Sequence, residues 1–315
     1  MTTNSTLHVV FGAGQIGSGL ARVLQAQRLR VRVVRRNAKP VGEGIEVVAG
    51  DARDAAFVLR ASEGAAVIYH CMNASSYTAR AWEAELPLFA DALIAAALAH
   101  DARLVCLDNL YGYGPTEGPR VESTPQNATG RKALVRVQIS ERLAAARAAG
   151  LRYTMLRPGD YFGPGTEQAL MSDAAVRGIA AGKRPMALGD PNAVHAFSYV
   201  PDVSAALAAL GTATNDVEGQ IFHAPMLQIA PRELLARIGT ELGVKVHPRA
   251  IGTVGMTLLA PFVSALRELR ESYYQWDRPF LASDARFRER FPSLGTPLDE
   301  AVRETARVAR PQLTL

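Results

Sequence analysis

Apolar and polar positions follow a regular rhythm through about the first 160 residues. Short apolar runs alternate with longer stretches that carry apolar residues at helical spacing, as at Leu20, Val23 and Leu24. The apolar runs are residues 7–12, 30–34, 45–51, 65–71, 103–109 and 152–159, and the longest helical stretches are about 81–100 and 131–149. Strands separated by helices of this length are typical of βαβ units. The pattern predicts an α/β protein with a Rossmann-type doubly wound parallel sheet.

The rhythm loosens after residue 160, where prolines, glycines and aromatic residues are frequent. We therefore predict a dinucleotide-binding domain over residues 1–165 and a smaller, mainly substrate-binding lobe over 166–315. Within the lobe, residues 197–223 are expected to return to the first domain. Ligands of doubly wound sheets bind beyond the carboxyl ends of the strands, so the late loops are candidates for a lid over that edge.

Composition narrows the class of partner. Of the 315 residues, 48% are hydrophobic and 21% charged, and the net charge of +5 comes from scattered arginines without a basic stripe. This favours a small anionic ligand and argues against nucleic acid. The longest apolar run, 251–266, is broken by Pro261 and is shorter than the ~18 residues of a membrane span. Two cysteines and no export signal lead us to expect a cytoplasmic protein with no membrane association.

The stretch FGAGQIGSGL follows the first predicted strand and opens a helix. Gly12 permits a tight turn, Gly14 lets the backbone approach a pyrophosphate, and Gly17 lets the helix pack closely on the strand. The helix N-terminus, which includes Gln15 and Ile16, offers free N–H groups and a partial positive charge to phosphates. The sequence therefore predicts a dinucleotide site here.

The end of the second predicted strand discriminates between cofactors. An acidic residue there holds the ribose hydroxyls of NAD, but this chain has Arg35 and Arg36. Guanidinium groups suit a 2′-phosphate, so we expect NADP(H) to be favoured over NAD(H). The alternative is that both arginines are solvated surface charges. Asp51, after the third strand, is placed either to meet the adenine or to cap a helix.

Three further segments carry a family resemblance. They are NLYGYGP at 109–115, RPGDYFGPG at 157–165 and FSYVPDV at 197–203. With the glycine turn, they make the chain resemble the extended short-chain dehydrogenase/reductase superfamily, and within it the NAD-dependent epimerase/dehydratase group. The resemblance spans about the first 210 residues. It implies a role for Pro158 beside the cofactor and suggests a homodimer through the two long helices.

The resemblance also implies a catalytic Ser or Thr and a Tyr and Lys four residues apart on one helix. This chain departs from all three: Asn109 occupies the Ser/Thr position, and Thr129 and Ala133 occupy those of the pair. None of its nine tyrosines has a lysine four positions later. The chain is thus similar to atypical members of the superfamily.

Other polar groups near the predicted carboxyl edge are candidates for the missing chemistry. Tyr111 is the favoured proton donor, with Asn109 to hold a substrate oxygen and Lys132 to replace the missing lysine. Lys132 and its neighbour Arg131 are cations in a first helical turn, where they oppose the helix dipole, although both are also typical solvated charges. The residues predicted to contact substrate are His70, Tyr77, Arg131, Tyr161 and His195.

Two functions remain open from the sequence. The first is an NADP-dependent oxidoreductase or epimerase/dehydratase-type enzyme that acts on a small molecule through a non-standard proton donor. The alternative is a redox-sensing or scaffold protein that binds NADP without turnover. We expect no metal site, because the cysteines and the six histidines show no ligand spacing.

Overall fold

The computed structural model describes residues 6–309, which form two compact units. The first unit comprises residues 6–114, 125–157 and 203–222, and the second comprises 115–124, 158–202 and 223–309. These bounds differ from the predicted boundary at residue 165, because 158–165 and the segment 115–124 both lie in the second unit. Segment 203–222 lies in the first unit.

The first unit is built on a seven-stranded sheet. Its strands are β1 (Leu7–Phe11), β2 (Arg30–Arg35), β3 (Glu46–Ala49), β4 (Ala65–His70), β5 (Arg103–Leu107), β6 (Tyr153–Arg157) and β10 (Gln220–His223). They run in the order β10-β6-β5-β4-β1-β2-β3, and each neighbouring pair from β6 to β3 is parallel. This is the order of a dinucleotide-binding doubly wound sheet, so the predicted fold class is confirmed.

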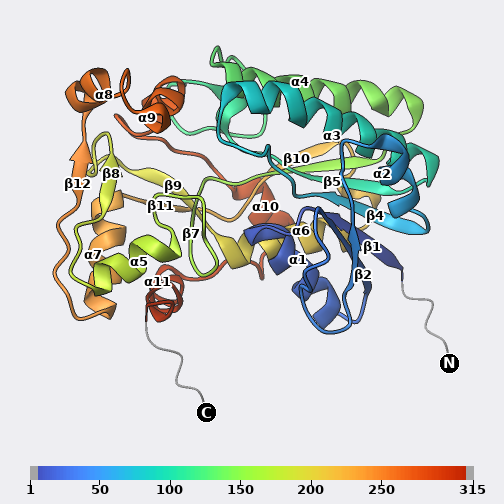
Figure 1. The fold of residues 1–315 in the computed structure, drawn as a ribbon, viewed down its shortest axis with the longest axis horizontal. Helices are drawn as coiled ribbons and strands as arrows, with labels where there is room; N and C mark the ends of the chain where they lie inside the picture. The colour runs from blue at the N-terminus through green and yellow to red at the C-terminus, as the bar shows by residue number, and fades with distance from the viewer. Residues whose placement is uncertain (1–5, 310–315) are drawn as a thin grey trace. The chain divides into compact units, whose positions relative to one another are not determined.

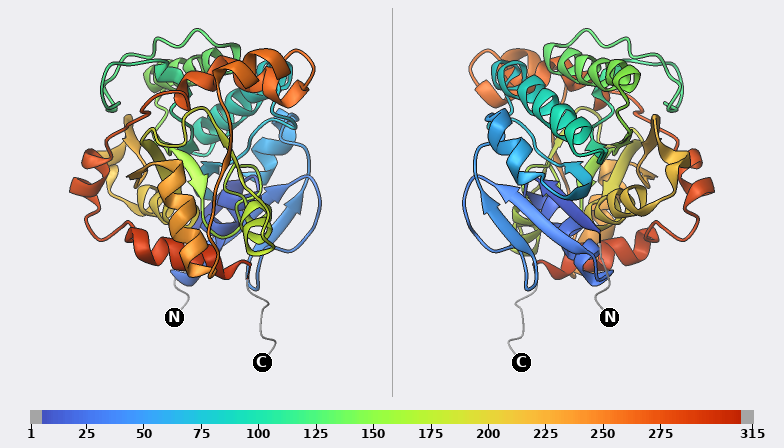
Figure 2. Two further views of the ribbon diagram at one scale, coloured as in Figure 1. Left: turned by 90° about the vertical axis from the view of Figure 1, so that its left-hand side faces the viewer. Right: turned by 90° about the vertical axis from the view of Figure 1, so that its right-hand side faces the viewer.

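Helices cover both faces of this sheet. They are α1 (Gln15–Ala26), α2 (Ala55–Ala61), α3 (Ala79–Ala99), α4 (Arg131–Ala146) and α6 (Val200–Thr212), with 3-10 turns η1 (Tyr111–Tyr113), η2 (Arg147–Ala149) and η3 (Asn215–Val217). Figure 1 shows α3 and α4 along one face and α1 and α6 along the other, and Figure 2 shows the α3–α4 layer from its ends. Side chains of β1, β4 and β5 fill the core under α2, α3 and α4.

Local sequence sets the ends of these helices. The Thr78 hydroxyl accepts a hydrogen bond from the N–H of Ala81 and begins α3, and Asp54 caps α2 in the same way. The helical stretch predicted over about 131–149 is followed by Gly150, which takes a φ of +94° directly after η2.

The second unit holds the shorter elements. Strands β7 (Asp160–Phe162), β9 (His195–Tyr199) and β11 (Leu227–Ile229) form a three-stranded sheet, and β8 (Met186–Leu188) pairs with β12 (Arg249–Ile251). The helices are α5 (Asp173–Ala180), α7 (Pro231–Glu241), α8 (Thr253–Leu259), α9 (Ser264–Leu269), η4 (Arg270–Gln275), α10 (Ala285–Arg290) and α11 (Leu298–Arg307). The apolar run 251–266 folds as two helical pieces, α8 and the start of α9, on either side of Pro261.

A buried arginine ties segment 203–222 into the first unit. Arg103, at the start of β5, is 6% exposed and donates to the carbonyl oxygens of Leu210 and Ala213. It also donates to Asn215 Oδ1 and Glu218 Oε1, at 2.8 and 3.1 Å. Because every acceptor lies after α6 or in its last turn, one guanidinium holds this connection against the sheet.

We predict that Arg103→Met lowers the free energy of unfolding by about 3 kcal/mol, because it leaves Glu218 and two carbonyls without their donor. Chemical denaturation measures this. The control is Arg142→Met, which breaks the exposed ion pair with Asp91 and should cost less than about 1 kcal/mol. Equal losses in the two variants would contradict the structural role of Arg103.

Candidate functional site

The glycine turn after β1 is shaped by close backbone contacts. Gly12 has a φ of +99°, and a Cβ there would lie 2.8 Å from the carbonyl carbon and oxygen of Cys71. A Cβ on Gly17 would lie 1.8 Å from the carbonyl oxygen of Gly12. Only glycine at both positions lets α1 start this near to β1 and β4.

Gly14 differs from these two glycines, because a Cβ on it would meet nothing within 4 Å. Gly14 is also the N-cap of α1, with no side-chain cap and no acidic residue in the first turn of the helix. The first turn contains Gln15 and the buried Ile16. The N-terminus of this twelve-residue helix therefore has no side-chain cap, and the space beside Gly14 is open.

Basic residues surround the end of β2. The Nη1 of Arg35 donates to the carbonyl oxygen of Lys39 at 3.1 Å, and Arg36 beside it is exposed. Arg53 holds the carboxylate of Asp51 with both ends of its guanidinium, and this lowers the pKa of Asp51 to about 2. Asp51 does not cap α2, since that position is taken by Asp54. Asp51 thus lies near Arg36 and Arg53, and the charge of Arg53 also interacts with Glu85.

Three aromatic side chains gather beyond the carboxyl ends of β4 and β5. The hydroxyl oxygens of Tyr77 and Tyr111 lie 3.0 Å apart. The indole of Trp82 stacks on Tyr111, with ring centroids 6.0 Å apart and planes 7° apart, and meets Tyr77 edge-on at 5.6 Å. Tyr77 comes from the loop before α3 and Tyr111 from η1. The structure therefore brings together two tyrosines that are far apart in the sequence, and we call them with Trp82 the aromatic cluster.

Two cations of α4 lie against the aromatic cluster. Lys132, in the first turn of α4, is 1% exposed, and its Nζ lies 5.0 Å from the ring centroid of Tyr77. Arg136, one turn further along, is 6% exposed and places its Cζ 4.6 Å from the ring centroid of Trp82. Residues four apart share a helix face, so α4 presents both charges to the same group of rings.

Arg131, the first residue of α4, is exposed and forms a bidentate ion pair with Glu83 of α3 at 2.8 and 2.5 Å. Its predicted contact with substrate stays a prediction. The structure gives it a visible role in joining α3 to α4.

Asn109 shapes the turn that carries Tyr111. Its Oδ1 accepts a hydrogen bond from the N–H of Tyr111 at 3.0 Å, which is an Asx turn. The contact uses the amide oxygen of Asn109, and the amide N–H groups take no part in it. The preceding residue, Asp108, is 6% exposed, and its Oδ2 accepts from Nε of Arg157 at 2.9 Å. Its Oδ1 lies 3.8 Å from Nε of Arg136.

His70, at the end of β4, is 2% exposed. Its Nδ1 accepts a hydrogen bond from the N–H of Met72, so the neutral ring carries its proton on Nε2, which has no hydrogen-bond partner among the described residues. Burial, assisted by the charge of Arg136, lowers the pKa of His70 to about 3. The ring is therefore a neutral donor near neutral pH and not a base.

The remaining predicted residues lie in the second unit. Pro158 is buried directly after β6, and Tyr161 is half-buried on β7, opposite Ser198 of β9. Both ring nitrogens of His195 are engaged: Nδ1 lies 3.0 Å from the carbonyl oxygen of Gln275, and Nε2 lies 2.6 Å from Oδ2 of Asp160.

The ring of His195 also stacks on Trp276, with centroids 4.1 Å apart. The contacts of these three residues with cofactor or substrate stay predictions. The contacts of His195 within the second unit give it a visible structural role.

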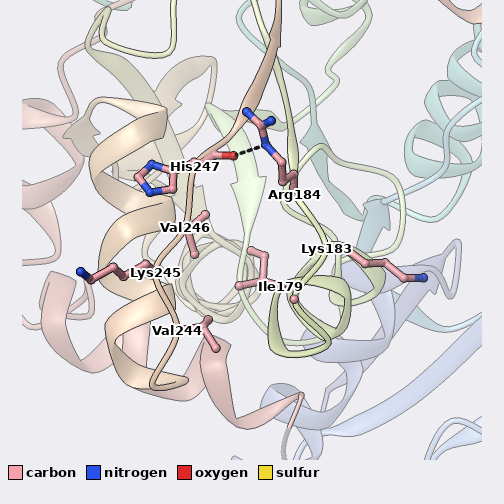
Figure 3. Close-up of a pocket in the computed structure, with 8 residues that line it drawn as sticks. Ile179, Lys183, Arg184, Val244, Lys245, Val246 and His247 are labelled. Carbon is pink, nitrogen blue, oxygen red and sulfur yellow. Dashed lines mark hydrogen bonds between the residues drawn. The ribbon is translucent and has the colours of Figure 1, made fainter.

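The second unit also contains a pocket of about 340 Å³. Figure 3 shows an apolar floor of Ile179, Val244 and Val246, and the tips of Lys183 and Lys245 extend away from it in opposite directions. The Nε of Arg184 donates to a backbone carbonyl oxygen at 3.1 Å. None of the predicted site residues lines this pocket.

Sequence reasoning missed Asp108 and Arg136. Arg136 had an available signal, since it lies four residues after Lys132 on the same helix face. Asp108 had none, because an acidic residue after a strand is also common in ordinary loops.

The part of the chain that the structure describes contains neither a candidate metal cluster nor a candidate membrane-spanning helix. Within residues 6–309, no three or more His, Cys, Asp and Glu side chains are grouped so that they could hold a metal ion. No helix in the same range is long and apolar enough to cross a bilayer.

Comparison with known proteins defines the family. Residues 8–224 match the model of the NAD dependent epimerase/dehydratase family. The chain belongs to this family, within the extended short-chain dehydrogenase/reductase superfamily that the sequence motifs predicted. No curated protein sequence matches the chain.

Solved structures agree on the fold. UDP-glucose 4-epimerase from Thermus thermophilus, in complex with NAD, superposes with a TM-score of 0.77 at 20% identity, covering 98% of this chain and 100% of that one. The dTDP-glucose 4,6-dehydratase DesIV from Streptomyces venezuelae, with NAD and TYD bound, gives 0.77 at 20% identity over 98% of each chain. The enzyme WbmH from Bordetella bronchiseptica, in complex with NAD+, gives 0.73 at 18% identity over 98% of this chain and 99% of that one.

The buried ring of His70 predicts acid sensitivity. Its pKa is about 3 in the folded protein and about 6.5 when unfolded, so between these values the unfolded chain binds a proton that the folded protein excludes. Stability is therefore full above pH ~6.5 and falls with acidification, by about 1.4 kcal/mol per pH unit from this residue.

Denaturation at pH 7 and pH 4.5 tests this expectation. Wild type should lose about 2.5 kcal/mol more than His70→Gln between the two pH values. His247→Gln, which alters an exposed ring, is the matched control. If His70→Gln lost as much stability as wild type, the ring would not be the source.

Proposed function

We propose that the chain is an NADP-dependent oxidoreductase or epimerase/dehydratase-type enzyme that acts on a small molecule through a non-standard proton donor. The observation that carries this proposal is the aromatic cluster, in which the Tyr111 hydroxyl lies beside a second hydroxyl, with a buried lysine on the neighbouring helix. Phenol and ammonium groups are the ones that the family resemblance associates with proton transfer, although here they do not form a tyrosine–lysine pair on one helix.

Support for a dinucleotide cofactor comes from the first turn of α1. The uncapped N-terminus and the open space at Gly14 suit a pyrophosphate, and the similar solved structures hold NAD. In this proposal Gly12, Gly14, Gln15, Ile16, Gly17, Asp51 and Pro158 border the cofactor. A bound nicotinamide group supplies or accepts the hydride of the reaction.

The positive charge at the end of β2 supports a preference for NADP. Arg35 and Arg36 stand where NAD-binding proteins carry an acidic residue, and Arg53 compensates the charge of Asp51 nearby. A guanidinium binds a 2′-phosphate through charge-assisted hydrogen bonds.

The chain's own residues then divide the chemistry. Tyr111 gives or takes the proton at the substrate oxygen, Asn109 holds that oxygen through its amide N–H groups, and Lys132 supplies positive charge. His70 offers its Nε2–H as a neutral donor. The contacts with substrate predicted for Tyr77, Arg131, Tyr161 and His195 belong to the same proposal.

Turnover is tested by following NADPH oxidation with a panel of aldehydes, ketones and sugar nucleotides. We expect Tyr111→Phe to lower kcat/KM by about 10²–10⁴-fold, the usual contribution of a general acid. The variant keeps the ring and its stacking on Trp82. Tight NADPH binding without turnover on the panel would instead support the redox-sensing or scaffold alternative, which the missing tyrosine–lysine pair keeps open.

Cofactor preference is tested with Arg35→Asp. Loss of a charge-assisted bond to the 2′-phosphate should reduce the ratio of NADPH to NADH affinity by about 10–100-fold, measured by equilibrium binding. Arg22→Asp, an exposed charge change on α1, should leave the ratio unchanged. An unchanged ratio in Arg35→Asp would contradict the assignment.

The phosphate contact is tested with two glycine substitutions. Gly14→Ala should leave the melting temperature near that of wild type and weaken dinucleotide binding at least about tenfold, since its methyl group points into open space. Gly17→Ala should lower the melting temperature without any ligand, because its methyl group meets the Gly12 carbonyl. If Gly14→Ala bound the dinucleotide with wild-type affinity, the assignment of the pyrophosphate to this turn would be contradicted.

A further inference from the structure

The hydroxyl groups of Tyr77 and Tyr111 are close enough to exchange a proton. At 3.0 Å between oxygens, one phenol donates a hydrogen bond and the other accepts it. The two residues belong to different elements, the loop before α3 and η1 after β5. Their contact is therefore a product of the fold.

The indole of Trp82 holds both rings in this arrangement. It is 1% exposed, lies parallel to the Tyr111 ring and meets the Tyr77 ring edge-on. Stacked and edge-to-face pairs are the favoured geometries of aromatic side chains. The rings consequently stay in place when either hydroxyl is removed, which makes Tyr→Phe substitutions informative.

The surroundings of the two hydroxyls differ. Tyr77 is 36% exposed, whereas Tyr111 is partly buried against the core under α3 and α4. Lys132 contacts the Tyr77 ring, and a positive charge beside a phenol favours its phenolate form. Tyr77 is therefore the member of the pair that water reaches, and its ring is the one that Lys132 contacts.

Other charged groups nearby have their own contacts. Glu83 of α3 pairs with Arg131, Glu85 of α3 accepts from the N–H and hydroxyl of Ser75, and Arg136 of α4 lies over Trp82. Beyond the end of β5, Asp108 is held by Arg157. Lys132, by contrast, contacts the Tyr77 ring directly.

We propose that Tyr77 and Tyr111 form a two-hydroxyl proton relay, a role that rests on the proposed function of Tyr111. The O–H bond of Tyr111 breaks as its proton forms a new O–H bond on the substrate oxygen. The proton of Tyr77 then passes to the Tyr111 phenolate oxygen, and Tyr77 recovers a proton from water. In the reducing direction, a bound reduced nicotinamide dinucleotide would supply the hydride, so one solvent proton and one hydride would be consumed for each carbonyl group.

Tyrosinate absorbance, titrated against pH without cofactor or substrate, tests the pair directly. Lys132→Met should shift one tyrosine transition upward by about one pH unit, since it removes the charge that favours the phenolate. Tyr111→Phe should shift the Tyr77 transition, because interacting groups titrate as a pair. Tyr153→Phe, at the amino end of β6, is the control and should produce neither of these two shifts.

Circular dichroism and thermal melting establish that each variant is folded before titration. If Tyr77 titrated identically in wild type, Tyr111→Phe and Lys132→Met, the relay would be overturned. This outcome does not depend on turnover. A lack of activity toward every substrate would instead count against the proposed function.

Kinetics on an active substrate provide the second test. Tyr77→Phe should lower kcat/KM by about 10–100-fold with unchanged NADPH affinity, and the double Tyr77→Phe, Tyr111→Phe variant should be no slower than Tyr111→Phe alone. Residues that act in series give this non-additive result. Losses that multiply would show two independent roles and overturn the relay.

Discussion

The carboxylate of Asp108 lies between two buried guanidinium groups, and the arrangement of the first unit's polar edge depends on it. It accepts a hydrogen bond from Arg157 at the end of β6 and faces Arg136 of α4 across 3.8 Å. Arg157 also donates to Gln126, in the segment before α4, and to Ser140, in the middle of α4. Burying these charges is unfavourable unless they are paired, so β5, β6 and α4 are held in one relative position. Asn109 and η1 follow Asp108 closely in the chain, so the same contacts also fix where they lie.

This constraint explains how polar chemistry gathers here without the family's tyrosine–lysine pair. The i, i+4 spacing of that pair fixes two groups on one helix, whatever surrounds it. In this chain the tyrosines come from a loop and from η1, and only Lys132 comes from α4. Their geometry depends on tertiary packing around Trp82 and Asp108. Activity should therefore be more sensitive to changes in that packing than in a relative with the pair on one helix.

The sequence was sufficient for features whose spacing is local. Apolar runs and helical periodicity predicted the doubly wound sheet, and the glycine turn predicted the contacts that Gly12 and Gly17 make. The contact of Tyr77 with Tyr111 was not predictable, because it joins elements through the packing of α3 on the sheet. Arg136 was missed although its spacing from Lys132 was an available signal, and Asp108 was missed because an acidic residue after a strand is common in ordinary loops. The engagement of both His195 nitrogens depends on residues near 160 and 275, which no short pattern connects.

Family membership and local charge favour different cofactors. The family is named for NAD and the similar structures contain NAD, yet a fold shared at about 20% identity does not fix the residues that meet the adenosine ribose. Discrimination between the two cofactors is a difference of affinities that one phosphate group determines. An uncompensated carboxylate beside β2 would repel that phosphate. Because Arg53 compensates the charge of Asp51, the positive charge of Arg35 and Arg36 beside it is not cancelled, and the proposed preference for the phosphorylated cofactor rests on this charge.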